Sequence, residues 1–258
     1  MRFLLLPLYF CLPAAMALGS WKAEAKAFSF KTEAMAAYVR GGGGLSRVAQ
    51  DTYGNSSGAA IFADEPVKFN LLGEIGAQFT LGALNIRLGL EVLRPKETLI
   101  EGKNSSSTTL FTLTSAVFAY SPTMTFEYVY SDLNVVRFYG FLSAGYSFVT
   151  LDNEYEMTTA GNTAFSPATS YTEKADGTAM GGVLGMGFET MFVDNATFSL
   201  DVGYRHLVVD NFKHKGTGAI IGDSSISKGD PVLNQDGSAR KLDLGGLTIG
   251  AMFRFYIN

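Results

Sequence analysis

The sequence predicts an all-β protein, an eight-stranded antiparallel transmembrane β-barrel with short periplasmic turns and long extracellular loops. Hydrophobic and polar residues alternate along eight segments, and the connections between them alternate between short and long. Charged residues make up only 17% of the 258 residues, against about 25% in soluble domains. The chain is 47% hydrophobic, which excludes a disordered protein. Its net charge of -4 does not indicate a nucleic-acid partner.

The first 17 residues have the pattern of a secretory signal peptide. Arg2 supplies the positive charge, Phe3–Leu12 is an apolar run too short to span a bilayer, and Ala15–Ala17 fits the small-x-small cleavage rule, with Ala17–Gly19 as a second candidate. Cleavage removes Cys11, the only cysteine, so we expect no disulfide in the mature chain. The expected organisation is a signal peptide (1–17), a short periplasmic N-terminal segment (18–27) and one barrel domain (28–258).

The eight predicted strands are found by their period-2 alternation. The second and third strands form the clearest hairpin, and Gly82-Ala83 joins them. The stretch Thr108–Tyr120 is also strand-like, and Pro122 predicts a bulge where it meets the fourth strand. The Ala-rich stretch before Arg40 is also compatible with a helix. The strands are expected at 28–40, 67–81, 84–92, 123–130, 136–148, 184–192, 197–205 and 242–257.

Short and long connections alternate between these strands, as in bacterial outer-membrane barrels. The long ones are rich in Gly, Ser, Thr, Asn and Asp, which is typical of solvated loops. The run Gly41–Gly44 is expected to begin a flexible loop, because no Lys-Ser/Thr pair follows it as a phosphate loop requires. The short turns are Gly82–Ala83, Ser131–Asn134 and Val193–Asn195, and the long loops are Gly41–Pro66, Arg94–Leu110, Leu151–Gly177 and Val209–Arg240.

The apolar face of each strand is expected to meet lipid, with the polar face inside. A soluble barrel would put a dense set of Lys and Glu on its polar face, whereas here that face is mostly small residues with a few charges of mixed sign. Paired charges would avoid burying lone ions. Tyr130 and Tyr204 would fit aromatic girdles. The predicted lumen charge network is Glu74, Arg87, Glu91, Glu127, Arg137, Glu189, Asp201, Arg205 and Arg254.

The last strand resembles the sorting signal of bacterial outer-membrane barrels, which reads polar, any, Gly, any, any, aromatic, any, aromatic. The matching residues are Thr248, Gly250, Phe253 and Phe255, although Tyr256–Asn258 follow where many members stop. The stretches Val136–Tyr146, Gly187–Glu189 and Val193–Asn195 resemble small barrels of the OmpA transmembrane-domain and OmpW type. This resemblance covers nearly all the mature chain. It implies a bacterial outer-membrane location, contact with outer-membrane lipid and lipopolysaccharide, and assembly by the barrel-assembly machinery.

Neither a catalytic constellation nor a metal or cofactor site is predicted. The two histidines, His206 and His214, have no partners at ligand spacing and are expected at a strand end and in a loop. The adjacent histidines and nearby serine of lipid A deacylases are missing from Tyr204–Val208. The loop acids Asp210, Asp223, Asp230 and Asp236 lack EF-hand spacing and are expected to be solvated.

The leading hypothesis is therefore a non-enzymatic envelope protein that presents the loops Gly41–Pro66, Leu151–Gly177 and Val209–Arg240 to an extracellular partner that the sequence does not identify. The alternative is a narrow pore or a lateral path for small apolar solutes, as OmpW-type barrels are thought to offer. The third hypothesis is a lipid-modifying enzyme. The lumen separates the first two: a scaffold should have its charges locked across the bore, and a pore should leave them wet and apart. The discriminating residues are Arg87, Glu127, Arg137 and Glu189.

Overall fold

The computed structural model describes residues 34–46, 68–133, 135–193, 195–221, 223–234 and 237–257. The predicted signal peptide, the segment 18–27, the first strand up to residue 33 and residues 47–66 of the first long loop lie outside the described residues. No helix within these ranges has both the length and the hydropathy to cross a membrane. The elements are β1 (Met35–Ser46), β2 (Lys68–Leu81), β3 (Leu84–Pro95), β4 (Thr98–Lys103), β5 (Thr109–Asp132), β6 (Val136–Met157), α1 (Thr159–Ala164), β7 (Tyr171–Val193), β8 (Ala196–His206), β9 (Val208–Val209), β10 (Lys213–His214), β11 (Gly218–Ile220), β12 (Asp223–Ile226), β13 (Leu242–Asp243) and β14 (Gly246–Ile257).

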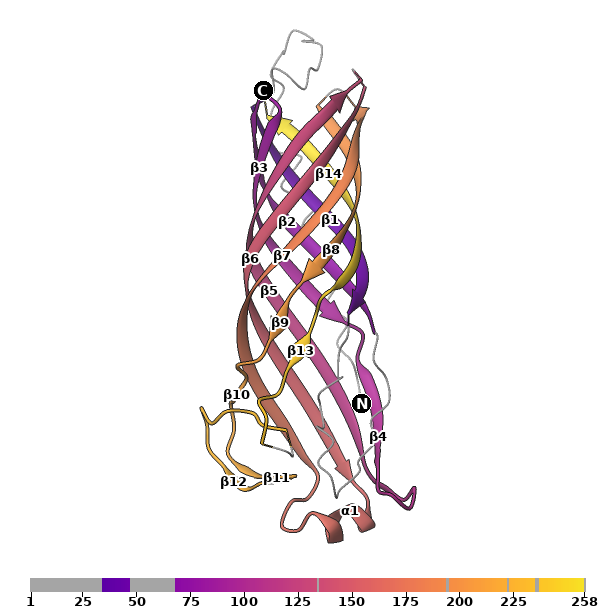
Figure 1. Cartoon of the computed structure of the whole chain (residues 1–258), viewed down its shortest axis with the longest axis vertical. Coiled ribbons are helices and arrows are strands. Elements are labelled where there is room, and N and C mark those ends of the chain that lie inside the picture. Colours follow the sequence, from indigo (N-terminus) through magenta and orange to yellow (C-terminus); the bar gives the residue numbers. More distant parts are fainter. Residues whose placement is uncertain are drawn as a thin grey trace, which may run out of the picture.

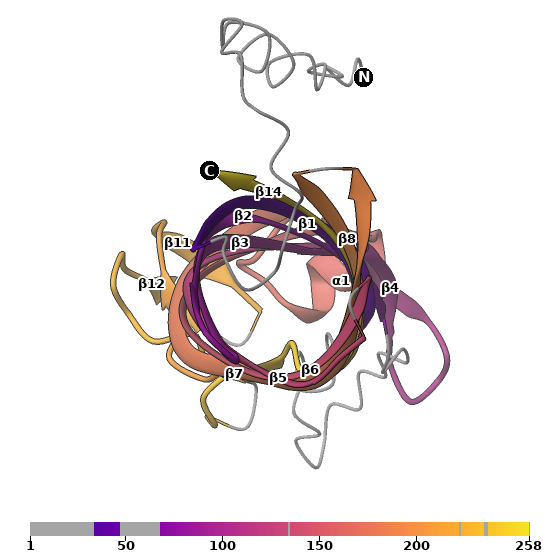
Figure 2. The same ribbon diagram turned by 90° about the horizontal axis from the view of Figure 1, so that it is seen from above.

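Eight of these strands form a closed antiparallel ring (Figures 1 and 2). The pairing runs β1–β2–β3–β5–β6–β7–β8–β14 and returns from β14 to β1, so each of the eight has two neighbours. Closure gives the backbone N–H and C=O groups partners along both edges of each strand, which a sheet in lipid requires. The predicted fold class and strand order are confirmed.

All the short connections lie at one rim. Gly82, at φ +67°, turns β2 into β3, and a conformation with positive φ favours glycine. Leu133 N–H donates to Val136 O at 2.8 Å in the turn between β5 and β6. The same rim holds the start of β1 and the end of β14, since Met35 pairs with Ile257. The predicted alternation of short and long connections is therefore correct.

Three strands are far longer than predicted. β5, β6 and β7 have 24, 22 and 23 residues, whereas β8 has 11, so at about 3.3 Å per residue they project well beyond the other strands. This extension, drawn in the lower half of Figure 1, contains most of what was predicted as the loop Leu151–Gly177 and, through β4, part of the loop Arg94–Leu110. Those loop predictions were wrong.

The reason is an inversion of polarity along the strands. Near the short turns the outward residues are apolar and the inward ones polar, but in the extension Leu113 and Tyr155 point inward and are buried, while Glu154 and Lys174 point outward and are exposed. The period of 2 continues while its polarity reverses, so a search for an apolar outward face ends at the inversion. The inversion lies near Phe118 and Phe148, the last large apolar outward residues of β5 and β6.

Two further local predictions were wrong. The run Gly41–Gly44 is not a loop, because it continues β1 and pairs with β2 on one side and β14 on the other. Pro122 does not mark a bulge: the register of β5 against β6 is unbroken from the Tyr120–Phe148 pair to the Thr123–Gly145 pair. The register shift comes later, between Val129 and Ser131, beside the short turn.

Candidate functional site in the barrel interior

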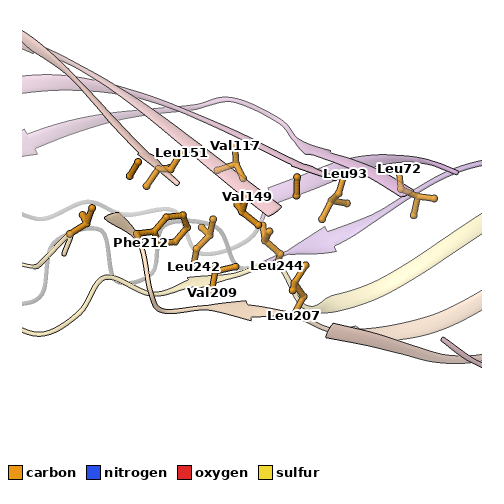
Figure 3. Packing of buried hydrophobic residues seen from close by; sticks show 13 residues of the cluster. Leu72, Leu93, Val117, Val149, Leu151, Leu207, Val209, Phe212, Leu242 and Leu244 are labelled. Carbon is orange, nitrogen blue, oxygen red and sulfur yellow. The ribbon is translucent and has the colours of Figure 1, made fainter. Parts of the chain in front are cut away.

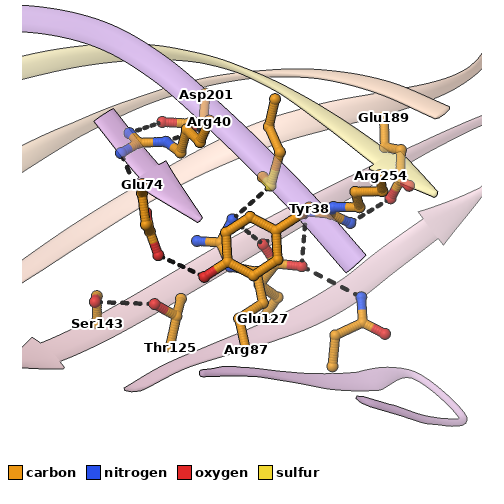
Figure 4. Close-up of polar contacts among 12 residues, drawn as sticks. Tyr38, Arg40, Glu74, Arg87, Thr125, Glu127, Ser143, Glu189, Asp201 and Arg254 are labelled. Atoms are coloured by element: carbon orange, nitrogen blue, oxygen red, sulfur yellow. Dashed lines mark hydrogen bonds and ion pairs between the residues drawn. The ribbon is translucent and has the colours of Figure 1, made fainter. Parts of the chain in front are cut away.

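The barrel interior brings together all nine residues of the predicted charge network. Each lies on the inward face of its strand, and each is 8% exposed or less. They come from strands on all sides of the ring, and Figure 4 shows most of them meeting across the bore. The nine are Glu74, Arg87, Glu91, Glu127, Arg137, Glu189, Asp201, Arg205 and Arg254.

The centre of this network is Arg254 of β14. Its Nη1 lies 2.5 Å from Glu189 Oε2 of β7, and its Nη2 lies 2.8 Å from Glu127 Oε1 of β5. All three side chains are 0% exposed. Arg254 therefore holds both carboxylates and bridges the bore. These pairings matter because a buried charge without a partner is costly.

Further contacts complete the coordination of Glu189. Arg137 Nε donates to Oε2 at 2.7 Å, the Tyr256 hydroxyl donates to Oε1 at 2.9 Å, and the Thr197 hydroxyl donates to the same oxygen. Arg137 Nη2 also donates to the Tyr256 hydroxyl at 2.6 Å. This network of charge-assisted hydrogen bonds ties β6, β7, β8 and β14 together at the short-turn end.

A second group of charges lies farther from the short turns. Arg87 Nη1 lies 3.2 Å from Glu127 Oε1, which links this group to the first. Arg40 binds Asp201 with Nε at 3.0 Å and Nη2 at 2.6 Å, the bidentate geometry that arginine favours. The predicted lumen residues did not include Arg40 or Tyr38. Both point inward, because Ala36, Tyr38 and Arg40 share one parity of β1, and extending the strand by six residues would have shown this.

Inward glycines make room for the large side chains of the lumen. An ideal Cβ at Gly185 would lie 2.5 Å from the Phe141 ring, and one at Gly187 would lie 2.7 Å from the Tyr139 ring. The Cβ of any other residue at 250 would lie 2.5 Å from Arg40 Nε. These inward glycines are therefore covered by aromatic and charged side chains of the neighbouring strand, which extend into the lumen and pack it.

The next layer contains Glu91 and Arg205, with Arg205 Nη2 donating to Glu91 Oε2 at 2.6 Å. Beside them lies a cavity of about 30 Å³ lined by Ser121, Ser143, Ser147 and glycines of β6 and β7. A space of this size holds roughly two water molecules. It is a small, largely polar pocket within a filled interior and not a bore.

On the long-strand side of these charges, a cluster of buried apolar side chains fills the interior as a plug (Figure 3). Val209, Phe212, Val232 and Leu244 come from the last long connection, and their side chains pack against Leu151 and other inward residues of the long strands. The expectation that Val209–Arg240 is wholly a solvated loop was therefore wrong. Its alternating apolar residues cover the inward face of the extension, which would otherwise expose apolar surface to water.

A buried polar group fastens this connection to β7. Glu173 Oε2 accepts hydrogen bonds from Arg240 Nη1 at 2.6 Å and Asn153 Nδ2 at 3.0 Å, and His214 Nδ1 lies 3.7 Å from Oε1. His214 is 3% exposed and belongs to β10, so it is not the loop histidine that was expected. Farther out, burial raises the pKa of Tyr171 well above its ordinary value, and its hydroxyl accepts from Ile221 N–H at 3.2 Å.

The outer wall is apolar in a belt around the ring. Phe69, Leu88, Phe126, Leu184 and Ile249 are among its exposed side chains. Tyr128 and Tyr130 mark its short-turn edge, and Tyr204 lies outward toward the other rim, at 60% exposure. An apolar wall with aromatic edges around a polar interior is the surface of a barrel that lies in lipid. The fold therefore defines a small transmembrane β-barrel of the bacterial outer-membrane class.

The four residues of the predicted assembly signal lie on both faces of β14. Thr248 and Gly250 point into the lumen, while Phe253 and Phe255 point outward and are 37% and 50% exposed. β14 is the strand that closes the ring onto β1.

Several solved structures of outer-membrane proteins are similar to this chain. OprG from Pseudomonas aeruginosa matches with 14% identity and a TM-score of 0.47 over 88% of this chain and 97% of that protein. A major outer membrane protein from Thermus thermophilus matches with 16% identity and a TM-score of 0.46 over 86% and 99%. The neisserial surface protein NspA matches with 8% identity and a TM-score of 0.41 over 86% and 96%. The matches extend to an enzyme, the outer membrane protease OmpT from Escherichia coli, at 12% identity and a TM-score of 0.29 over 90% and 100%. No family model and no curated protein matches the sequence.

Proposed function

We propose that this protein is a non-conducting, non-enzymatic outer-membrane barrel that stabilises the envelope and presents a rigid extracellular extension. The observation that carries the proposal is the Arg254 bridge between Glu127 and Glu189, in which all three side chains are fully buried across the bore. This is the locked arrangement expected of a scaffold, and the apolar plug on its long-strand side is a second obstruction.

The extension supports the presenting role. It has an apolar core of its own, in which Phe111 and Tyr155 pack 5.6 Å apart between ring centroids. A surface carried on such a core is held in place for recognition. The exposed parts of α1, β4 and the β11–β12 hairpin replace the predicted loops as the surface offered to a partner.

The non-enzymatic part of the proposal rests on the state of the lumen acids. Glu127, Glu189 and Asp201 are each held by an arginine at hydrogen-bond distance. A general acid or base needs access to a substrate proton, and these carboxylates are committed to guanidinium groups. Assembly through the barrel-assembly machinery, with the signal on β14, belongs to the same proposal.

Conductance in planar bilayers tests the scaffold role. We expect the refolded wild type to be silent. Val209 pairs with Leu242, so a variant that joins these residues with Asn-Gly in place of 210–241 removes Phe212 and Val232 from the plug and keeps a hairpin. We expect this deletion alone and Arg137→Ala/Arg254→Ala alone to stay silent, and the combination to conduct. Steady wild-type conductance would sink the proposal.

A lateral path for small apolar solutes is the second candidate, and one observation favours it. The β7–β8 ladder ends at the Gly182–His206 pair, after which β9 pairs with β13 instead of β7. The interior at this level is apolar. An ideal Cβ at Gly181 lies 3.2 Å from Leu207 Cβ, close to the separation that a disulfide spans. The test is uptake of an apolar solute into vesicles that contain the Gly181→Cys/Leu207→Cys variant. Uptake that is blocked only when the two cysteines form a disulfide would favour the path. Wild-type uptake equal to that of empty vesicles would exclude it.

A further inference from the structure

An apolar groove runs along the outer wall over β1. Its floor is the run Gly41–Gly44, and its walls are Phe69 of β2, Leu200 of β8, and Leu247 and Ile249 of β14, around a volume of about 440 Å³. An ideal Cβ at Gly41 would contact nothing within 4 Å, so the floor is open to the outside. On a wall that faces lipid, a groove of this kind is a place for an acyl chain.

The groove reaches the edge of the apolar belt at one end. Gly43 pairs with Leu71, and Leu71 pairs with Arg94, so the three residues form one row across β1, β2 and β3. On β3, Val92 is the last outward apolar residue before Arg94. From this row the groove extends past Gly41 toward the short turns and into the apolar belt.

Basic side chains stand at that same edge. Arg94 and Lys96 line a hollow with Phe69, Leu71 and Glu97, and Phe69 is the wall that this hollow shares with the groove. The backbone N–H of Lys96 donates to Phe69 O at 2.8 Å, which fixes the backbone of Lys96 beside that of Phe69. Glu97 lies 3.3 Å from Arg94, whose side chain is 66% exposed. Two cations face one anion, so the hollow is positive on balance.

We propose that the groove and the basic pair together bind one anionic, phosphate-bearing lipid of the leaflet at the long-strand rim. Its acyl chain lies over Gly41–Gly44, and its phosphate accepts hydrogen bonds from Arg94 and Lys96. The site goes beyond the scaffold role and rests only on the lipid-facing orientation of the outer wall. A second copy fits less well, because a two-fold axis along the membrane normal would bring Arg94 and Lys96 of both copies to one level, where they repel.

Native mass spectrometry of the detergent-purified protein tests the site. The probe is an equal mixture of phosphatidic acid and phosphatidylcholine with identical acyl chains. We expect the wild type to retain one phosphatidic acid in preference. Arg94→Gln/Lys96→Gln should lower that retention about tenfold, to the level of phosphatidylcholine. Gly41→Leu, which fills the groove, should lower retention of both lipids.

Matched controls keep the result specific. Lys103→Gln/Lys215→Gln removes two exposed lysines that are also ion-paired, and Gly140→Leu adds the same side chain at an outward glycine where an ideal Cβ meets nothing closer than 3.8 Å. Both should behave as wild type. Gly41→Val serves if Gly41→Leu does not refold. Each of three outcomes would overturn the proposal. The wild type could retain both lipids equally, the groove variant could retain lipid fully, or the wild type could form a dimer that the groove variant abolishes. Bilayer conductance is unaffected by any of these outcomes, so the scaffold role fails or survives separately.

Discussion

The guanidinium of Arg40 occupies the space that a side chain at Gly250 would fill, since an ideal Cβ there would lie 2.5 Å from Arg40 Nε. Gly250→Ala should therefore push Arg40 away from Asp201 and destabilise the barrel by about 3 kcal/mol. Urea unfolding of protein refolded in lipid measures this. With Arg40→Ala already present, Gly250→Ala should cost almost nothing more, because the clash is gone.

This cycle also separates two roles of Gly250. Refolding in vitro does not use the assembly machinery, so a loss of stability there cannot come from a damaged sorting signal. If Gly250→Ala refolds with wild-type stability, the glycine is not needed for the Arg40–Asp201 contact, and its place in the sorting pattern becomes the better explanation.

Removing the arginine that bridges two carboxylates should be more damaging than removing a surface charge. Arg254→Ala leaves Glu127 and Glu189 buried with fewer positive partners, and we expect a loss of about 3–5 kcal/mol in the free energy of unfolding. The matched control is Lys215→Ala, whose ion pair with Asp176 is about half exposed on both sides and should be worth less than about 1 kcal/mol. Equal losses in the two variants would mean that the lumen network does not stabilise the fold.

The direction in which the strands face is tested by a pair of substitutions on β3. Leu88 is 46% exposed on the belt, and Asn85 is buried in the lumen, where it donates to Glu127 at 3.3 Å. Leu88→Arg places a charge in lipid and should cost about 2–4 kcal/mol near the midplane, whereas Asn85→Ser should be mild, at about 1 kcal/mol. Refolding yield into vesicles gives the comparison, and equal tolerance of both changes would contradict the lipid-facing assignment.

Sequence periodicity was sufficient for the part of the barrel in lipid. There each strand carries apolar residues outward and polar residues inward, so alternation alone gives both the strand and the face of Glu127 or Arg254. Periodicity failed where the surroundings of the outer face change from lipid to water. Beyond Phe148 the outward residues Glu154 and Glu156 are exposed, and the inward residues Val149 and Leu151 are buried against the plug, so the pattern inverts and reads as a loop.

Contacts between distant segments could not be predicted from the sequence, for a different reason. Nothing local in Glu173 or Arg240 indicates that the two meet at 2.6 Å inside the extension. Their pairing depends on how the last connection folds back, and that path is set by the burial of Phe212, Val232 and Leu244. The glycine run failed similarly: four glycines read as a turn signal, while pairing on both edges holds them in β1.

The contact between Glu173 and Arg240 makes a prediction about the plug. Arg240→Ala removes the 2.6 Å ion pair and leaves Glu173 with Asn153 and His214 as its neighbours, which should cost about 2 kcal/mol. The loss should fall on the local stability of the connection rather than on the ring, because Arg240 pairs with Glu173, which lies 16 residues along β7 from Glu189, the partner of Arg254. Hydrogen exchange at Phe212 and Val232 should therefore accelerate by more than tenfold, with exchange in β2 and β3 unchanged. Lys228→Ala, an exposed change in the same connection, is the control. Uniformly faster exchange across the barrel would show that the plug and the ring unfold as one unit, and unchanged exchange at Phe212 would show that apolar burial alone holds the plug.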